Sequence, residues 1–198
     1  LYLLRDRVLG REEDGRYRAL RAKWGSRADR NFFLFFQLQA LFVVFFSLPY
    51  LLIFLDPHPG LGLLEWTGAM VWAIGNAGAI TADRQLARWR SNPENHGRTA
   101  RTGLWAWSRH PNYFFESVTW CGVALVATAG PWGWVSWIVP AALLFLLFRV
   151  TGIPATEAQA LRSRADYADY QRTTSVFVPL PPRADDAQND SLDRRVTS

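Results

Sequence analysis

"FFLFFQLQALFVVFFSLPYLLIFL", residues 32–55, is the stretch that decides the fold, and it holds 24 consecutive residues without a charged side chain. At about 1.5 Å per residue, a helix of this length crosses the roughly 30 Å hydrocarbon core of a bilayer with some tilt. A buried helix in a soluble core is the alternative interpretation, but this run is longer than a small core can cover. The stretch therefore predicts a membrane-spanning helix.

Three further apolar runs follow, and each carries a single charged residue: 61–82, 113–129 and 132–150. Turn-forming residues at 56–60 and at Gly130–Pro131 divide the four runs into two hairpins. The ten Trp and thirteen Phe suit a membrane protein, because aromatic rings gather at bilayer interfaces. We therefore expect an all-α polytopic membrane helical bundle with four spans in this chain.

Basic residues set the expected orientation. Residues 1–31 hold nine Lys or Arg and residues 83–110 hold six Arg, whereas the connections at 56–60 and 130–131 hold none. Under the positive-inside rule, the two basic segments and the C-terminus lie in the cytoplasm. One Lys against 21 Arg is typical of a GC-rich genome, so we expect a bacterial inner membrane. The net charge of +5 then reflects topology, and membrane lipid rather than nucleic acid is the expected partner.

The domain organisation follows from composition. Residues 1–180 read as one membrane domain, and the polar stretch 181–198 reads as a disordered tail. The opening "LYLLRDR" resembles the end of a helix, so we expect spans upstream of residue 1. The single cysteine, Cys121, excludes an intrachain disulfide. The sequence has no cluster of His and Cys residues, so no metal site is predicted. The oligomeric state is left open.

"SRHPNYFFE", residues 108–116, places polar groups at the start of an apolar run. Pro111 suits the first position of a helix, so the following N–H groups lack intrahelical acceptors and favour an anion such as phosphate. Arg109 and His110 stand beside them, and Asn112 and Glu116 share one helix face. We expect Glu116 to pair with Arg90 or Arg109, or to accept from a ribose hydroxyl. Membrane anchoring and an interhelical hydrogen bond are the structural alternatives.

Two more segments bring polar groups to the same side. Asp83 and Arg90 are seven residues apart, so they share a face of the continuing second span; a solvated helix end is the alternative. A cytoplasmic amphipathic helix is expected after Gly152–Pro154, and it should run to about Tyr170. Its surface carries Glu157, Leu161 and Arg164 at helical spacing, with Tyr167 and Tyr170 beyond. Together the segments predict a polar, anion-accepting pocket at the cytoplasmic mouth of the bundle.

Three motifs carry a resemblance to a known family: "GREEDGRYRALRAKWG" (10–25), "ADRQLARWRSNPENHGRTARTGLWAWSRHPNYFFE" (82–116) and "GIPATEAQALRSRADYADYQRTTSVFVP" (152–179). The chain resembles the DUF1295 branch of the steroid 5-alpha-reductase-like integral-membrane oxidoreductases. The resemblance implies a bundle of about seven spans and NADPH-dependent reduction of an enone-type C=C bond. The substrate would be a lipophilic or steroid-like small molecule, in lipid metabolism.

The resemblance also implies site residues. Asp83 and Arg90 match nucleotide-contacting positions, Asn112 matches the cofactor asparagine, and Tyr2 matches a further contact. The full expected cofactor-binding set is Tyr2, Asp83, Arg90, Arg109, His110, Asn112, Tyr113, Glu116, Glu157, Arg164, Tyr167 and Tyr170. Catalytic residues are unassigned, because those that polarise the substrate carbonyl lie on upstream helices in the family.

The chain departs from the family pattern at two places. Phe115 replaces the usual Gly, which affects local helix packing, and "GIPATEAQAL" replaces the basic, histidine-rich helix of the steroid reductases. "RHPNY" and the closing "Y…Y…FVP" are also compatible with isoprenylcysteine carboxyl methyltransferases, which use S-adenosylmethionine. A membrane methyltransferase is therefore the alternative enzyme, and a non-enzymatic membrane interaction protein is the third interpretation.

Overall fold

The computed structural model describes residues 15–57, 60–150 and 152–183. These residues are helical, with one isolated parallel β-bridge between Ser108 and Ser175 and no strand. The structure divides into two compact units, residues 1–47 and 48–198. Tyr2, which the sequence assigned to the cofactor site, lies outside the described residues, as does most of the predicted tail.

The first unit contains a short basic helix followed by the start of a long apolar one. Helix α2 spans Gly15–Trp24, a 3₁₀ turn spans Gly25–Arg27, and α3 spans Ala28–Phe54. Gly25 has a φ of 52°, a left-handed conformation that lets the chain turn sharply between the helices. The ring of Phe32 holds the turn, with its centroid 4.9 Å from that of Trp24 and 5.0 Å from the Arg21 guanidinium carbon.

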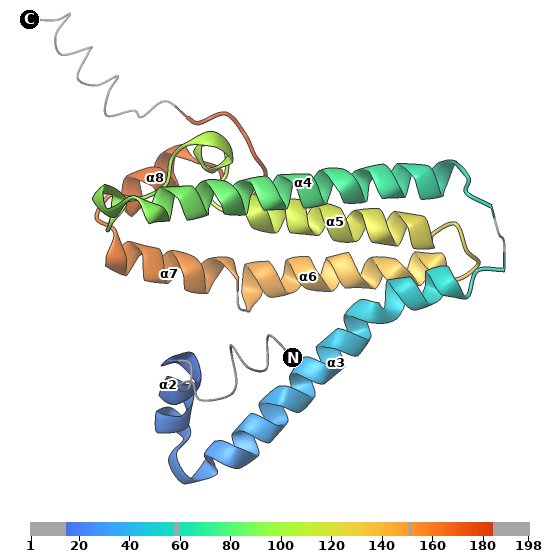
Figure 1. Cartoon of the computed structure of the whole chain (residues 1–198), viewed down its shortest axis with the longest axis horizontal. Coiled ribbons are helices and arrows are strands. Elements are labelled where there is room, and N and C mark those ends of the chain that lie inside the picture. Colours follow the sequence, from blue (N-terminus) through green and yellow to red (C-terminus); the bar gives the residue numbers. More distant parts are fainter. Residues whose placement is uncertain (1–14, 58–59, 151, 184–198) are drawn as a thin grey trace, which may run out of the picture. The chain divides into compact units, whose positions relative to one another are not determined.

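The second unit is built on two antiparallel helices packed side by side, α4 (Leu63–Ser91) and α5 (Pro111–Ala127) (Figure 1). Glycines let the two backbones approach closely, as small residues do between membrane helices. A Cβ added at Gly75 would lie 2.5 Å from the backbone nitrogen of Thr119. A Cβ at Gly78 would collide with the Phe115 ring. Phe115, where the family pattern has Gly, is therefore accommodated by a glycine on the facing helix.

After α5 the chain turns and runs back beside it as two further helices. A 3₁₀ turn at Gly133–Trp137 leads into α6 (Ile138–Arg149), which lies beside α5, and α7 (Ile153–Ser163) continues beyond it (Figure 1). Helix α8 (Tyr167–Thr173) follows after a break. Sequence analysis expected one helical stretch from the end of Gly152–Pro154 to about Tyr170. That expectation is wrong, because Arg164 adopts an extended backbone that ends α7.

Two helical stretches are long and apolar enough to cross a membrane, Tyr17–Phe54 and Gly133–Ser163. The first expected span, 32–55, lies within α3, which carries many exposed apolar side chains. The second and third expected spans correspond to most of α4 and to α5. The four-span topology, the cytoplasmic C-terminal helix and the boundary of the membrane domain at residue 180 stay predictions.

Candidate functional site

The stretch before α5 is clamped by a distant segment of the chain. Helix α5 begins at Pro111, as the sequence predicted, with His110 at its N-cap. The buried Ser108 donates its hydroxyl to the Phe177 carbonyl at 2.7 Å and accepts the His110 N–H at 3.1 Å. The Arg109 N–H donates to the Ser175 carbonyl at 2.8 Å. The helix start is therefore fixed in place by residues 175–177.

Arg109 ties the start of α5 to α7 and α8. Its Nε lies 2.7 Å from Glu157 Oε1, and its Nη1 donates to the Gln171 and Thr174 carbonyls at 2.8 Å each. Gln171 Nε2 donates to Glu157 Oε2 at 2.8 Å, and His110 Nε2 lies 3.3 Å from Glu157 Oε1. Glu157 is the ion-pair partner of Arg109, so the Arg109 alternative for Glu116 is wrong, and the ribose alternative stays a prediction. Within the described residues Glu116 forms no ion pair with Arg90 either.

Asp166 explains why α7 ends where it does. Its two carboxylate oxygens accept from Thr99, at 3.1 Å from the backbone nitrogen and 2.7 Å from the hydroxyl. Arg101 donates to the Asp166 carbonyl and lies 3.8 Å from its carboxylate. Burial raises the pKa of Asp166, but the Thr99 hydrogen bonds and the Arg101 charge outweigh it and hold the pKa below the ordinary 3.8. These bonds across 67 residues override the local preference for a continuous helix.

Two tyrosines of α8, Tyr167 and Tyr170, form the inner wall of a pocket at the start of α5. The Tyr170 hydroxyl donates toward the Ser108 and Trp105 carbonyls, and the Tyr170 side chain is almost fully buried. Burial raises the pKa of Tyr170, and burial together with the nearby Glu157 carboxylate raises the pKa of Tyr167 to about 12. Both phenols are therefore neutral hydrogen-bond donors at physiological pH. The Tyr170 hydroxyl holds the wall together, which is a structural role.

The segment 99–107 returns the chain to α4. The Trp105 indole N–H donates to the Ala82 carbonyl at 2.9 Å, and Leu104 N–H donates to Gln85 Oε1 at 2.9 Å. Gly103 has a φ of 59°, and a side chain there would collide with Gln85. Trp105 is thereby held against the C-terminal half of α4. It forms one side of the space between α4, α5 and α7.

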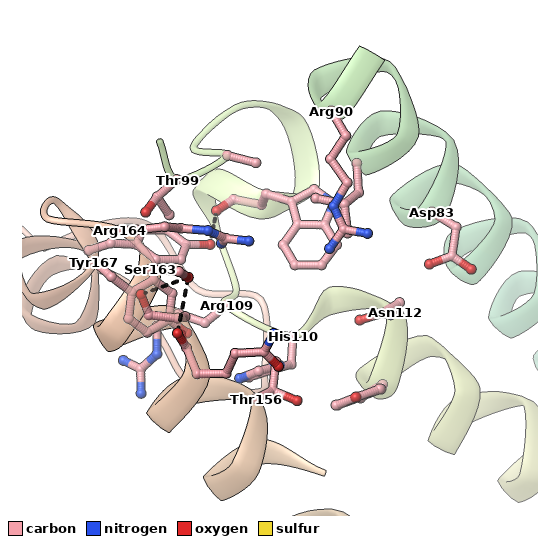
Figure 2. A pocket seen from close by; sticks show the side chains of 17 residues that line it. Asp83, Arg90, Thr99, Arg109, His110, Asn112, Thr156, Ser163, Arg164 and Tyr167 are labelled. Carbon is pink, nitrogen blue, oxygen red and sulfur yellow. Dashed lines mark hydrogen bonds between the residues drawn. The ribbon is translucent and has the colours of Figure 1, made fainter. Parts of the chain in front are cut away.

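That space is a pocket of about 320 Å³ (Figure 2). Nine of the residues predicted from the sequence line it: Asp83, Arg90, Arg109, His110, Asn112, Tyr113, Arg164, Tyr167 and Tyr170. Asp83 and Arg90 come from α4, and Asn112 from the first turn of α5 (Figure 2). As their seven-residue spacing predicted, the α4 pair reaches one site. The structure thus brings the three predicted polar segments together.

Sequence reasoning also chose residues that lie elsewhere. Glu116 is exposed on α5 and does not line the pocket, and Glu157 lies behind the wall as the partner of Arg109. The α7 residues that do line it are Thr156, Gln159, Ala160 and Ser163. Their spacing of i, i+3, i+4 and i+7 marks one helix face, so this signal was present in the sequence. The remaining lining residues that the sequence reasoning missed are Leu86, Thr99, Ala100 and Trp105.

The pocket holds polar groups without partners. Within the described part of the chain, the side chains of Asp83, Arg90, Asn112 and Arg164 form no hydrogen bond or ion pair. Arg90 reaches from α4 into the pocket, and Arg164 approaches from the α7 side (Figure 2). Two guanidinium groups offer ten N–H donors in planar forks that match phosphate or carboxylate oxygens. The site therefore suits an anionic ligand that also presents hydroxyl or amide groups.

Residues 1–174 match the family described as "Protein of unknown function (DUF1295)". The chain belongs to the DUF1295 family. This match covers both expected hairpins and every predicted site residue, so the family suspected from the motifs is confirmed.

The DUF1295 chain is also similar to three mammalian enzymes named "3-oxo-5-alpha-steroid 4-dehydrogenase 1". The mouse protein is 28% identical over 115 residues, which are 58% of this chain and 41% of that protein. The bovine protein is 29% identical over 116 residues, 58% of this chain and 41% of its own length. The rat protein is 26% identical over 114 residues, 58% and 40% respectively. The chain thus spans about two fifths of these relatives, and no solved structure matches it.

Proposed function

We propose that this chain forms the cofactor-binding part of a membrane reductase that binds NADPH and reduces an enone-type C=C bond of a lipophilic, steroid-like substrate. The observation that carries the proposal is the convergence of Asp83, Arg90 and Asn112 on one pocket. The reaction class rests on the name of the relatives. A 4-dehydrogenase of a 3-oxo steroid forms a double bond conjugated with the oxo group, and its reversal is enone reduction.

The side chains of the pocket fit a dinucleotide. The guanidinium groups of Arg90 and Arg164, which have no partner among the described residues, suit phosphate oxygens. The Asn112 amide both donates and accepts, which suits a carboxamide or a ribose hydroxyl. The Asp83 carboxylate accepts from hydroxyl groups. NADPH would supply the hydride for the β-carbon of the enone, while a proton goes to the α-carbon.

The chain's own contribution is binding and orientation. The buried wall of Tyr167 and Tyr170 and the clamped start of α5 form a rigid frame, so a bound ligand meets groups already in place. Orientation in such a site supplies a large part of many enzymes' rate enhancement.

The proposal includes a location. Four spans would place the pocket at the cytoplasmic end of the bundle, in a bacterial inner membrane, with the basic loops and α8 in the cytoplasm. The lipophilic substrate would then enter from the bilayer, while the water-soluble cofactor enters from the cytoplasm. Membrane lipid and a small lipophilic molecule are the proposed partners.

Thermal unfolding of the purified chain in detergent tests the proposal. We expect NADPH to raise the melting temperature and S-adenosylmethionine to leave it unchanged. Asn112→Ala should weaken NADPH binding about tenfold, because a lost buried hydrogen-bond partner costs roughly 1–3 kcal/mol. Asn76→Ala is the control, since the Asn76 amide donates to its own helix at the Trp72 carbonyl, away from the pocket. Stabilisation by S-adenosylmethionine alone would assign the chain to the methyltransferases instead.

A further inference from the structure

A second pocket of about 290 Å³ adjoins the first, between the end of α4 and the segment 92–98. It shares Leu86, Arg90, Ala100 and Arg164 with the first pocket, so the two form neighbouring compartments. Sequence analysis assigned no role to the segment 92–98, and the proposed function does not use it. The second compartment is therefore a separate feature to explain.

The charged side chains that line the second compartment are all basic. Arg90, Arg98 and Arg164 line the second compartment, and no Asp or Glu does. The three guanidinium groups come from α4, from the 92–98 segment and from the end of α7, and none has an ion-pair partner in the described part of the chain. Arg101 and Arg109, by contrast, lie beside Asp166 and Glu157. Three like charges around one cavity repel each other unless an anion lies between them.

The compartment is preformed rather than loose. Asn95 Nδ2 donates to the Trp89 carbonyl at 2.8 Å, and Asn92 Oδ1 accepts the Glu94 N–H at 3.0 Å. These bonds fold the segment back onto the end of α4. Trp89 lines the compartment, and its buried indole N–H has no hydrogen-bond partner within the described residues. Such an orphaned donor costs about 1–3 kcal/mol, so the site carries more donors than the protein itself satisfies.

We propose that this second compartment binds a phosphate group. Three cations with no carboxylate call for a ligand with more than one negative charge, and a phosphate monoester carries about −1.5 to −2 at pH 7. Arginine forks bind phosphate oxygens in a bidentate manner, so the three guanidinium groups of this compartment suit a phosphate. The phosphate group belongs either to the far end of a dinucleotide held in the first pocket or to an anionic lipid headgroup. The dinucleotide source rests on the proposed function, and the phosphate chemistry does not.

Arg98 is the residue to test, because it lines the second compartment and not the first. The variants are Arg98→Gln, which removes the charge, and Arg98→Lys, which keeps the charge but loses the fork. Arg84→Gln is the matched control, since Arg84 lies on the same helix as Arg90 and lines neither pocket. Arg98 is exposed, so its replacement leaves folding intact. The probes are inorganic phosphate, NADP⁺, NAD⁺ and nanodiscs of phosphatidylcholine with or without phosphatidic acid.

We expect inorganic phosphate to stabilise the parent beyond chloride of equal ionic strength, and Arg98→Gln to weaken this binding about tenfold, with Arg98→Lys between them. A matching loss for NADP⁺ but not NAD⁺ identifies the dinucleotide source. A loss of stabilisation by phosphatidic acid, with NADP⁺ binding unchanged, identifies the lipid source. Equal phosphate binding by Arg98→Gln and Arg84→Gln overturns the proposal. If the parent binds phosphate but no dinucleotide, the proposed function fails while the phosphate site stands.

Discussion

Replacing Glu157 with Gln should destabilise the chain far more than removing an exposed carboxylate. The Glu157 carboxylate accepts from Arg109 Nε at 2.7 Å and from Gln171 Nε2 at 2.8 Å, and its side chain is only 15% exposed. The amide of the variant keeps the size but loses the charge, and its NH₂ group cannot accept from Gln171. Arg109 would then retain only neutral acceptors, namely the amide oxygen of the variant and the two backbone carbonyls.

The magnitude follows from these contacts. Breaking a buried ion pair costs roughly 3–5 kcal/mol, and the two retained carbonyl bonds reduce this to about 2–3 kcal/mol. For a protein of this length each kcal/mol shifts the melting temperature by about 2–4 °C, so we expect a fall of about 5–10 °C. The control is Asp169→Asn, because the Asp169–Arg172 pair is 53% and 61% exposed and such pairs contribute less than about 1 kcal/mol.

Thermal unfolding of the three proteins in the same detergent measures the difference. Equal melting temperatures for parent and Glu157→Gln would refute the clamp role of Arg109. A fall of the same size in Asp169→Asn would show that any lost carboxylate on α7 or α8 has this effect.

Three further predictions concern packing, pH and topology. Gly75→Ala should lower the free energy of unfolding by about 1–3 kcal/mol, because its Cβ would lie 2.5 Å from the Thr119 nitrogen. Gly60→Ala, whose Cβ would meet nothing within 4 Å, should change the free energy of unfolding little. The stabilisation from the Asp166–Thr99 hydrogen bonds should be fully present above pH 3.8 and should be lost as the pH falls through the lowered folded-state pKa of Asp166. The acid unfolding of Asp166→Asn should lack this pH-dependent loss of stability. In a Cys121-free chain, Gly60→Cys and Ser91→Cys should react with membrane-impermeant reagents from opposite sides; labelling from one side would exclude the four-span topology.

Sequence reasoning predicted the features that are determined by residues close together in the chain. Pro111 marked the start of α5, and the spacing of Asp83 and Arg90 placed both at one pocket. The family motifs assigned Asn112 to the cofactor site, whereas helical spacing alone placed it only on the same helix face as Glu116. These features depend on neighbours within two turns of a helix, so sequence reasoning reaches them.

Other features depend on residues far away in the chain. The end of α7 depends on Thr99 meeting Asp166, and the partner of Arg109 is Glu157 rather than the nearer Glu116. Nothing in the spacing of the residues indicates such pairs, because side chains 48–67 positions apart are brought together only by the fold. The contact between Gly78 and the Phe115 ring could not be predicted either, because it depends on the register between α4 and α5.

The long separation of the clamping residues has a consequence for biogenesis. The Ser108 carbonyl meets its Tyr170 donor 62 residues later, after α6 has been made. At about 5–20 residues per second, translation reaches that tyrosine roughly 3–12 s after the serine. During this interval the nascent α4–α5 hairpin lacks the wall of its ligand pocket. Under the proposed function, nucleotide binding therefore requires that α6 and α8 have been made, and ribosome-arrested chains that stop before residue 167 should not retain nucleotide.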